Sequence, residues 1–325
     1  MKNYAKKLSA IIAASAAFAL AGCAQPITVV FESDRPWHSG ELSFEKLGYS
    51  VGVYDTTAGT EDDKRVLIAD GELVYTLNEK APDASNIAYT TLDMQMRVTY
   101  NDRAPDADKG KTDKISSTTE FQTASLVAST VAKTVELDNR DGVRNNSYTL
   151  NADYFGEKKA TINFTSANVT DKLDIPTGSY YDNETMYYLA RATGIELNSN
   201  TNFVMVSLFD SFLSDKFDDF NMVASSKADP ATVVLGEFAG SFGVEAATAD
   251  DGTTYYPVSC LETSIIKNEK LSGPPHYVYY SEKPFTQNGK EHAKIPVKMS
   301  YSEYKGNTVV RVTEYILTSC SFERE

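Results

Sequence analysis

Few residues of this sequence are placed for catalysis. None of its histidines has a second histidine two to four residues further on, so the paired-histidine signatures of zinc enzymes are absent. Ser241 lies in Ala-Gly-Ser-Phe-Gly, which imitates a nucleophile elbow, but a strand pattern follows where the elbow needs a helix. The three histidines are His38, His276 and His292. We therefore expect a protein that is not an enzyme; a hydrolase joining Ser241 or an acid pair to His276 or His292 is the alternative.

Acidic residues also suggest no cofactor. Asp215, Asp218 and Asp219 crowd one short stretch and could attract a cation. They match no calcium-binding loop, since such a loop alternates its oxygen ligands around a glycine at its sixth position. We expect these carboxylates to form a solvated surface, with no metal and no cofactor bound.

Cys23 is the residue whose surroundings define a specific chemistry. Three lysines precede an apolar run over 8–20, which has the length of a secretory leader and is too short to span a bilayer. Leu20-Ala21-Gly22 then lead directly to Cys23. This arrangement resembles the lipobox of bacterial lipoproteins. The resemblance covers residues 1–23 and implies that Cys23 receives a diacylglycerol thioether and becomes the first residue of the mature chain.

The resemblance divides the chain into three parts. Residues 1–22 are expected to be the signal peptide, 23–40 the lipidated N-terminus with a short tether, and 41–325 one β-rich extracytoplasmic domain. Two or more acyl chains on one residue hold a protein stably on a membrane, whereas one chain binds only marginally. We expect anchoring to the bacterial cell membrane or the outer membrane.

Charge narrows the class of partner. The formal net charge is −14, and removal of the leader's lysines makes it more negative. Phosphate backbones and anionic headgroups repel such a surface, so nucleic acid is not an expected partner. A hydrophobic content of 42% with 20 tyrosines predicts a folded chain with a sizeable core.

Two cysteines remain besides Cys23. Cys260 and Cys320 both lie in segments with a strand pattern. An exported protein permits a disulfide between them, which over such a long loop would contribute about 4 kcal/mol. The alternative is two buried thiols that act as small hydrophobic side chains.

Alternation with a period of two dominates the chain beyond residue 40. The clearest run is 90–100, where apolar side chains from Leu92 to Tyr100 alternate with polar ones. The runs 148–154 and 160–164 flank a turn at Gly156, which predicts a hairpin. No βα unit recurs, so we expect a mainly β fold with one large antiparallel sheet of about 10–12 strands.

Two helices are expected between the strands. The first runs over 182–192, with an aspartate cap, Arg191 in its last turn and Gly194 beyond it. The second runs over 210–220, where phenylalanines recur at helical spacing. A sheet interrupted midway by a helix can curl around it, so we expect a half-barrel with one or two central helices.

This arrangement resembles the half-barrel of the lipoprotein-carrier class and of periplasmic domains that share it. The resemblance covers about residues 180–320 and rests on the 182–192 helix, the Ile295–Met299 run and the ending Tyr315-Ile316-Leu317. It implies a concave apolar face that takes up a lipid or a hydrophobic segment of an envelope protein. It transfers no functional residue.

The alternative function is a module that binds glycans or the cell wall. Tyrosines crowd the C-terminal third, and an exposed planar row of them could stack on sugar rings. The tyrosines concerned are Tyr255, Tyr256, Tyr277, Tyr279, Tyr280, Tyr301, Tyr304 and Tyr315. Burial of these rings would remove this interpretation.

Overall fold

The computed structural model describes residues 44–57, 65–137, 147–164, 169–175, 177, 180–192, 200–206, 219–227, 229–267, 276–305 and 308–324. The first half of this part is a run of strands: β1 (Phe44–Asp55), β2 (Val66–Glu79), β3 (Tyr89–Tyr100), β4 (Thr112–Gln122), β5 (Ala128–Glu136), β6 (Tyr148–Asp153), β7 (Lys159–Phe164) and β8 (Val169–Asp174). A 3₁₀ turn, η1 (Asn183–Thr185), and the helix α2 (Met186–Ala192) follow.

The second half returns to strands: β9 (Asn200–Val206), β10 (Asp219–Ser226), β11 (Ala231–Leu235), β12 (Ala247–Thr248), β13 (Thr254–Lys267), β14 (His276–Ser281), β15 (Phe285–Gln287), β16 (Lys290–His292), β17 (Pro296–Lys305) and β18 (Thr308–Ser321). The 3₁₀ helix η3 (Glu237–Phe242) lies between β11 and β12. It contains Ser241, and the strand pattern that follows this residue in the sequence yields only the two-residue strand β12.

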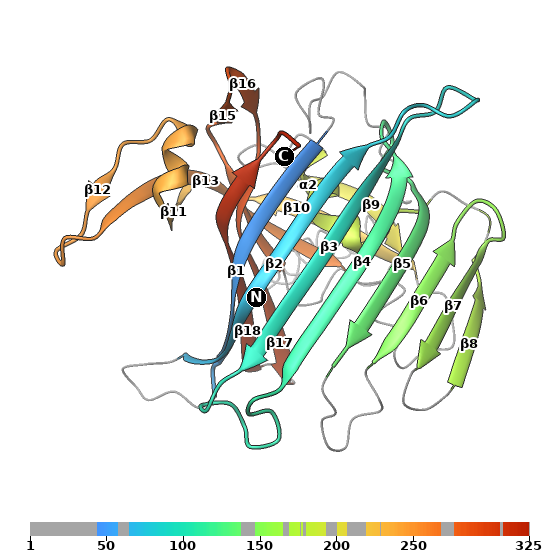
Figure 1. Ribbon diagram of the computed structural model, residues 1–325, viewed down its shortest axis with the longest axis horizontal. Coiled ribbons are helices and arrows are strands. Elements are labelled where there is room, and N and C mark those ends of the chain that lie inside the picture. Colours follow the sequence, from blue (N-terminus) through green and yellow to red (C-terminus); the bar gives the residue numbers. More distant parts are fainter. Residues whose placement is uncertain are drawn as a thin grey trace, which may run out of the picture.

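Sixteen of the described strands form one antiparallel sheet that does not close into a barrel, and β15 and β16 form a separate two-stranded sheet. Its main path runs β8-β7-β6-β5-β4-β3-β2-β1-β18-β17-β14-β13-β10-β9, so that β8 and β9 lie at its two ends (Figure 1). Each neighbouring pair on this path is antiparallel, as the absence of βα units predicted. The predicted fold class is confirmed, although the main path has 14 strands and the expected number was lower.

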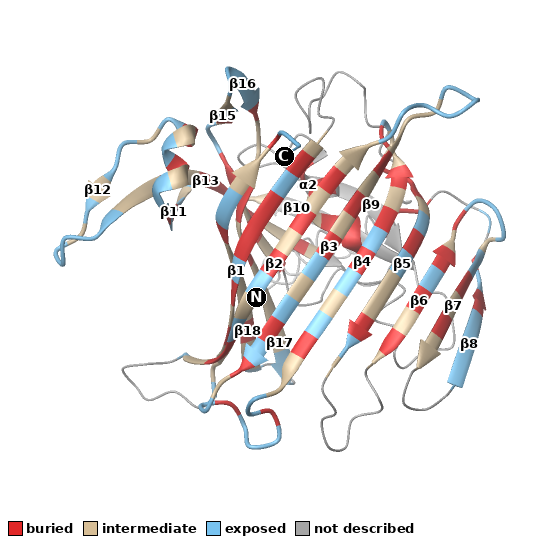
Figure 2. Cartoon of the chain, viewed as in Figure 1, coloured by how far each residue is buried: buried red, intermediate tan, exposed pale blue. Residues whose placement is uncertain are grey.

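Alternation of burial gives the sheet an inner and an outer face. In β3, Leu92, Met94 and Val98 are buried, while Gln95 and Arg97 between them are exposed. The strands β2 to β5 show the same alternating bands in Figure 2. The period-two pattern of the sequence therefore predicted which side chains of these strands face the core.

The only described α-helix connects the two ends of the sheet. The segment 180–192, here called the central segment, contains η1 and α2 and follows β8, while β9 lies beyond it. The predicted helix over 182–192 is thus confirmed in part, since its first turn is 3₁₀. Most of the second predicted helix lies outside the described residues, and its last two residues, Asp219 and Phe220, begin the strand β10.

Candidate functional site

The central segment lies on the inner face of the sheet and contacts both halves of it. On one half, the hydroxyl of Tyr154, directly after β6, donates a 2.9 Å hydrogen bond to Asp182. On the other half, the hydroxyl of Tyr280 in β14 donates a 2.6 Å hydrogen bond to the carbonyl of Tyr187. The sheet therefore curls around this segment, as the half-barrel prediction required, and the inner face is concave.

Aromatic and aliphatic side chains form the contact between α2 and the sheet. Met186 and Tyr188 are buried in the main core, and the rings of Tyr75 and Tyr188 meet edge to face at 6.3 Å. The ring of Tyr49 in β1 continues this contact at 6.1 Å from Tyr75. Burial raises the pKa of Tyr49, Tyr75 and Tyr188 well above the usual value, so these phenols stay neutral.

A buried ion pair joins the end of α2 to the first strand. Nη1 of Arg191 lies 3.0 and 2.8 Å from the two carboxylate oxygens of Glu45, and the side chains are 1% and 0% exposed. The other guanidinium nitrogens donate to the carbonyl of Ala293, with Nε at 3.2 Å and Nη2 at 3.0 Å. The hydroxyl of Tyr188 donates to Glu45 at 3.1 Å. We call Arg191, Glu45, Tyr188 and Ala293 the Arg191 cluster.

A second buried group holds the beginning of the central segment. Nζ of Lys133 in β5 lies 2.6 Å from Glu184, and both side chains are less than a tenth exposed. Asp182 caps η1 by accepting a hydrogen bond from the backbone N–H of Glu184 at 2.9 Å. We call Asp182, Glu184, Lys133 and Tyr154 the Asp182 cluster. Oppositely charged side chains of the sheet, Glu45 and Lys133, thus bind the two ends of the central segment.

The pKa of Asp182 is raised from 3.8 to about 6. Burial is the largest cause, and the nearby charge of Glu184 adds to it. Hydrogen bonds from the Glu184 backbone and from Tyr154, together with the charge of Lys133, act in the opposite direction. Asp182 therefore binds a proton more tightly in the folded protein than in the unfolded chain.

This difference predicts a pH-dependent stability. As the pH rises from about 4 to about 6, the unfolded chain ionises Asp182 first, so the free energy of unfolding falls over this range. A raised pKa of this size corresponds to about 2–3 kcal/mol. Asp182→Asn, which removes the titration, is expected to gain that much stability relative to the wild type between pH 4 and pH 7. Urea unfolding across this range measures it, and parallel pH curves for the two proteins would contradict the assignment.

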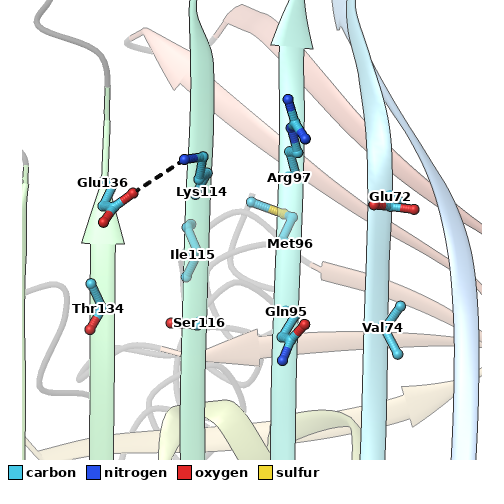
Figure 3. Close-up of a pocket in the computed structure, with 10 residues that line it drawn as sticks. All are labelled: Glu72, Val74, Gln95, Met96, Arg97, Lys114, Ile115, Ser116, Thr134 and Glu136. Atoms are coloured by element: carbon cyan, nitrogen blue, oxygen red, sulfur yellow. Dashed lines mark ion pairs between the residues drawn. The ribbon is translucent and has the colours of Figure 1, made fainter.

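The outer face carries two neighbouring hollows over β2 to β6. The first, of about 320 Å³, is lined by Glu72, Gln95, Arg97, Ser116 and Thr134, among others, and by an exposed ion pair between Lys114 and Glu136 (Figure 3). The second, of about 370 Å³, shares Gln95, Ser116 and Thr134 with the first. Amides, hydroxyls and charges of both signs line both hollows, and the apolar residues Val74, Met96 and Ile115 also line the first (Figure 3).

The residues weighed for catalysis are not brought together by any contact in the described chain. Cys23, His38, Asp215 and Asp218 lie outside the described residues. Ser241 lies in η3, His276 packs its ring against Tyr301 at 4.8 Å, and His292 stacks on Phe322 at 3.4 Å. The described residues contain no group of three or more histidine, cysteine or acidic side chains that could hold a metal ion.

The two C-terminal cysteines are free thiols in the structure. Cys260 is buried and Cys320 is partly buried, and the structure has no disulfide between them. Burial raises the pKa of Cys260 to about 12 and that of Cys320 above its usual value. Both therefore remain protonated and pack as small apolar side chains, which was the alternative.

The C-terminal tyrosines do not form an exposed row. Tyr280 is 1% exposed, and Tyr256, Tyr279 and Tyr315 pack against the core. Among the eight tyrosines considered, Tyr304 alone belongs to the exposed class, at 43%. These tyrosines, all of which lie among the described residues, therefore lack the exposed planar row on which the glycan-binding alternative depended.

None of the helices among the described residues has both the length and the hydropathy that a helix needs to span a membrane.

Fold and site together define a mainly β domain built as an open antiparallel sheet around a short central segment. No family model matches the sequence, and no curated protein does. Among solved structures, a beta-barrel-like protein of domain of unknown function DUF1849 from Brucella abortus aligns over 86% of this chain and 97% of its own. The two share 12% identity with a TM-score of 0.44, a similarity too low to transfer a function.

Both charged partners on the sheet were missed by sequence reasoning. Glu45 lies at alternate positions with the buried Leu47 and Tyr49, and Lys133 with the buried Val131 and Val135. A charge at a position whose neighbours two residues away are apolar is the signal that could have found them. Buried charges are rarely placed on a core face without a partner, so each such position predicts an ion pair.

Proposed function

We propose that this protein is a lipid-anchored extracytoplasmic lipoprotein, not an enzyme, which binds a lipid or a hydrophobic segment of a partner on the concave face of its sheet. The leader ending at Cys23 supports the anchor and the location outside the cytoplasm. The sequence has only three histidines, and none lies two to four residues from another, which supports a role in binding over one in catalysis.

One observation carries the binding part of the proposal. The concave face, lined by buried side chains such as Tyr49, Tyr75 and Met94, is covered in its described part by the short central segment of the same chain. A ligand of similar size and polarity could take the place of that segment. In this proposal, the ligand and the central segment occupy the same part of the concave face in turn.

The way in which the central segment is held supports exchange. A buried ion pair adds little stability compared with well-packed apolar side chains, because desolvation offsets most of the attraction between the charges. It does define one geometry. Both ends of the central segment depend on such pairs, Arg191 with Glu45 and Glu184 with Lys133. The two ion pairs therefore fix one position of the central segment, although well-packed apolar side chains at the same places would hold it more strongly.

A matched pair of substitutions tests the binding function. Glu184→Gln leaves Lys133 buried without its carboxylate, which loosens the central segment and is expected to raise the affinity for a fluorescent fatty acid at least fivefold. Glu136→Gln removes the carboxylate partner of Lys114 in an exposed pair on the neighbouring strands, with side chains 59% and 63% exposed, and is expected to change nothing.

The measurement is a fluorescence titration of the purified full-length chain in detergent-free nanodiscs, with mass spectrometry of any co-purified lipid. If the wild type, the Glu184→Gln protein and the Glu136→Gln protein all failed to bind the fatty acid, the proposed lipid-binding function would be wrong. Equal binding to all three would show that the central segment does not control access to the site.

A further inference from the structure

A row of four charged side chains crosses the outer face of the sheet, opposite the concave face. Glu72 in β2 faces Arg97 in β3. Arg97 also faces Lys114 in β4, which in turn faces Glu136 in β5. All four are exposed, and all four line the first hollow (Figure 3). The charges along this row are therefore negative, positive, positive and negative.

The two central cations are not fully used within the protein. Like charges directly opposite each other in a sheet repel, and the formal net charge of the chain is −14, so this adjacent pair is a local exception. Lys114 has a weak partner, since its Nζ lies 3.7 Å from Glu136 in an exposed pair. Arg97 makes no side-chain hydrogen bond or ion pair with any residue that the structure describes. Its guanidinium donors are therefore available to a ligand.

The flanking carboxylates limit the kind of anion that can bind. Neighbouring strands are about 4.8 Å apart, so the backbones that carry Arg97 and Lys114 are about 5 Å apart and those that carry Glu72 and Glu136 about 14 Å apart. The two glutamates and the acidic remainder of the surface repel an extended polyanion. A single carboxylate fits between them, because it is planar and accepts two parallel hydrogen bonds from a guanidinium.

Neutral hydrogen-bonding side chains lie beside the charged row. Gln95, Ser116 and Thr134 are each two residues along their strands from a member of that row, or about 7 Å, and they line both hollows. Among the described residues, these three side chains have no hydrogen-bond partner. The second hollow continues to Thr149 and Asn151 in β6. Amides and hydroxyls both donate and accept hydrogen bonds, as the hydroxyl groups of a sugar do.

We propose that the outer face of β2 to β5 binds an acidic saccharide. Its carboxylate lies between Arg97 and Lys114, and its hydroxyl groups lie over Gln95, Ser116 and Thr134. The volumes of the two hollows, about 320 and 370 Å³, are within the range of about 300–1,000 Å³ that is usual for small-molecule sites. This site is on the opposite face from the lipid site of the proposed function and does not depend on it.

Two disaccharides that differ by one carboxylate test the inference on the full-length chain in phosphatidylcholine nanodiscs. Cellobiouronic acid is expected to bind the wild type at least fivefold tighter than cellobiose, and Arg97→Gln is expected to abolish this preference. Gln95→Ala is expected to weaken both disaccharides and to keep their ratio. Arg103→Gln is the matched control, since Arg103 is exposed in the loop after β3, lines neither hollow and makes the same change in charge. A ligand-observed NMR titration at low ionic strength measures the affinities.

Several outcomes would overturn the inference. They are equal binding of the two disaccharides to the wild type, binding of neither, and a preference for the acid that survives in the Arg97→Gln protein. Inorganic phosphate and phosphatidylglycerol vesicles are the competing probes. If either displaced cellobiouronic acid at a concentration below the dissociation constant of the disaccharide, the row would bind a simple anion or a lipid surface, and the saccharide assignment would be wrong. None of these results alters the fatty-acid titration that tests the proposed function.

Discussion

Arg191→Met is expected to lower the free energy of unfolding by about 3–5 kcal/mol, because it leaves a buried carboxylate without its cation. The side chain of Glu45 is 0% exposed, and after the substitution the hydroxyl of Tyr188 at 3.1 Å is the only hydrogen-bond donor of the Arg191 cluster left to it. The carbonyl of Ala293 loses two donors at the same time. Urea denaturation at pH 7, followed by circular dichroism, measures the loss.

A double substitution separates the buried charge from the packing of the arginine side chain. Glu45→Gln/Arg191→Met replaces both charges by neutral groups of similar size, and is expected to recover most of the stability lost by Arg191→Met. Arg311→Met is the matched control, since Arg311 pairs with Glu303 at 3.8 Å and is partly exposed. Its expected effect is below about 1 kcal/mol. If Arg191→Met had an effect as small as that of Arg311→Met, the ion pair would not hold α2 to β1.

Cys23→Ser is expected to move the whole protein from the membrane to the soluble fraction. Serine has no sulfur and therefore cannot form the thioether that carries the acyl chains in lipobox proteins. Each buried methylene contributes about 0.8 kcal/mol to membrane attachment, so loss of two or more chains removes tens of kilocalories per mole of anchoring. Metabolic labelling with an alkyne analogue of palmitate, followed by detergent phase separation, measures the change.

Cys260→Ser is the matched control for the anchor, because its thiol is buried in the folded domain. It is expected to keep the label and the membrane fraction of the wild type. Equal labelling of the Cys23→Ser protein would show that lipid is attached elsewhere, and absence of label from the wild type would leave the leader as an ordinary secretory signal.

The strands that carry the site could be predicted because half of each is buried. The run 90–100 alternates apolar and polar residues from Leu92 to Tyr100, and the structure places β3 within one residue of these bounds. The turn between β4 and β5, over 123–127, has no glycine or proline to mark it in the sequence.

Other strands have no such signal. β8 lies at one end of the sheet and is exposed at every position but Leu173, so alternation of hydrophobicity does not mark it. β15 and β16 are three residues each, and only the turn at Asn288-Gly289 between them was visible in the sequence. The ion pairs of the central segment were missed for another reason. Lys133 and Glu184 are 51 positions apart in the sequence, and Glu45 and Arg191 are 146 apart. Only the curl of the sheet brings the members of each pair together.

The pairing of β1 with β18 has a consequence for how the chain folds. These two strands lie in the middle of the main path, where Leu47 faces Cys320 and Val51 faces Tyr315. The sheet therefore consists of two meanders of mostly local contacts, joined by one contact between the two ends of the domain. Such a contact of high sequence separation forms slowly, and only after β18 has been synthesised. Until β18 is available, one edge of β1 in the first meander remains unpaired.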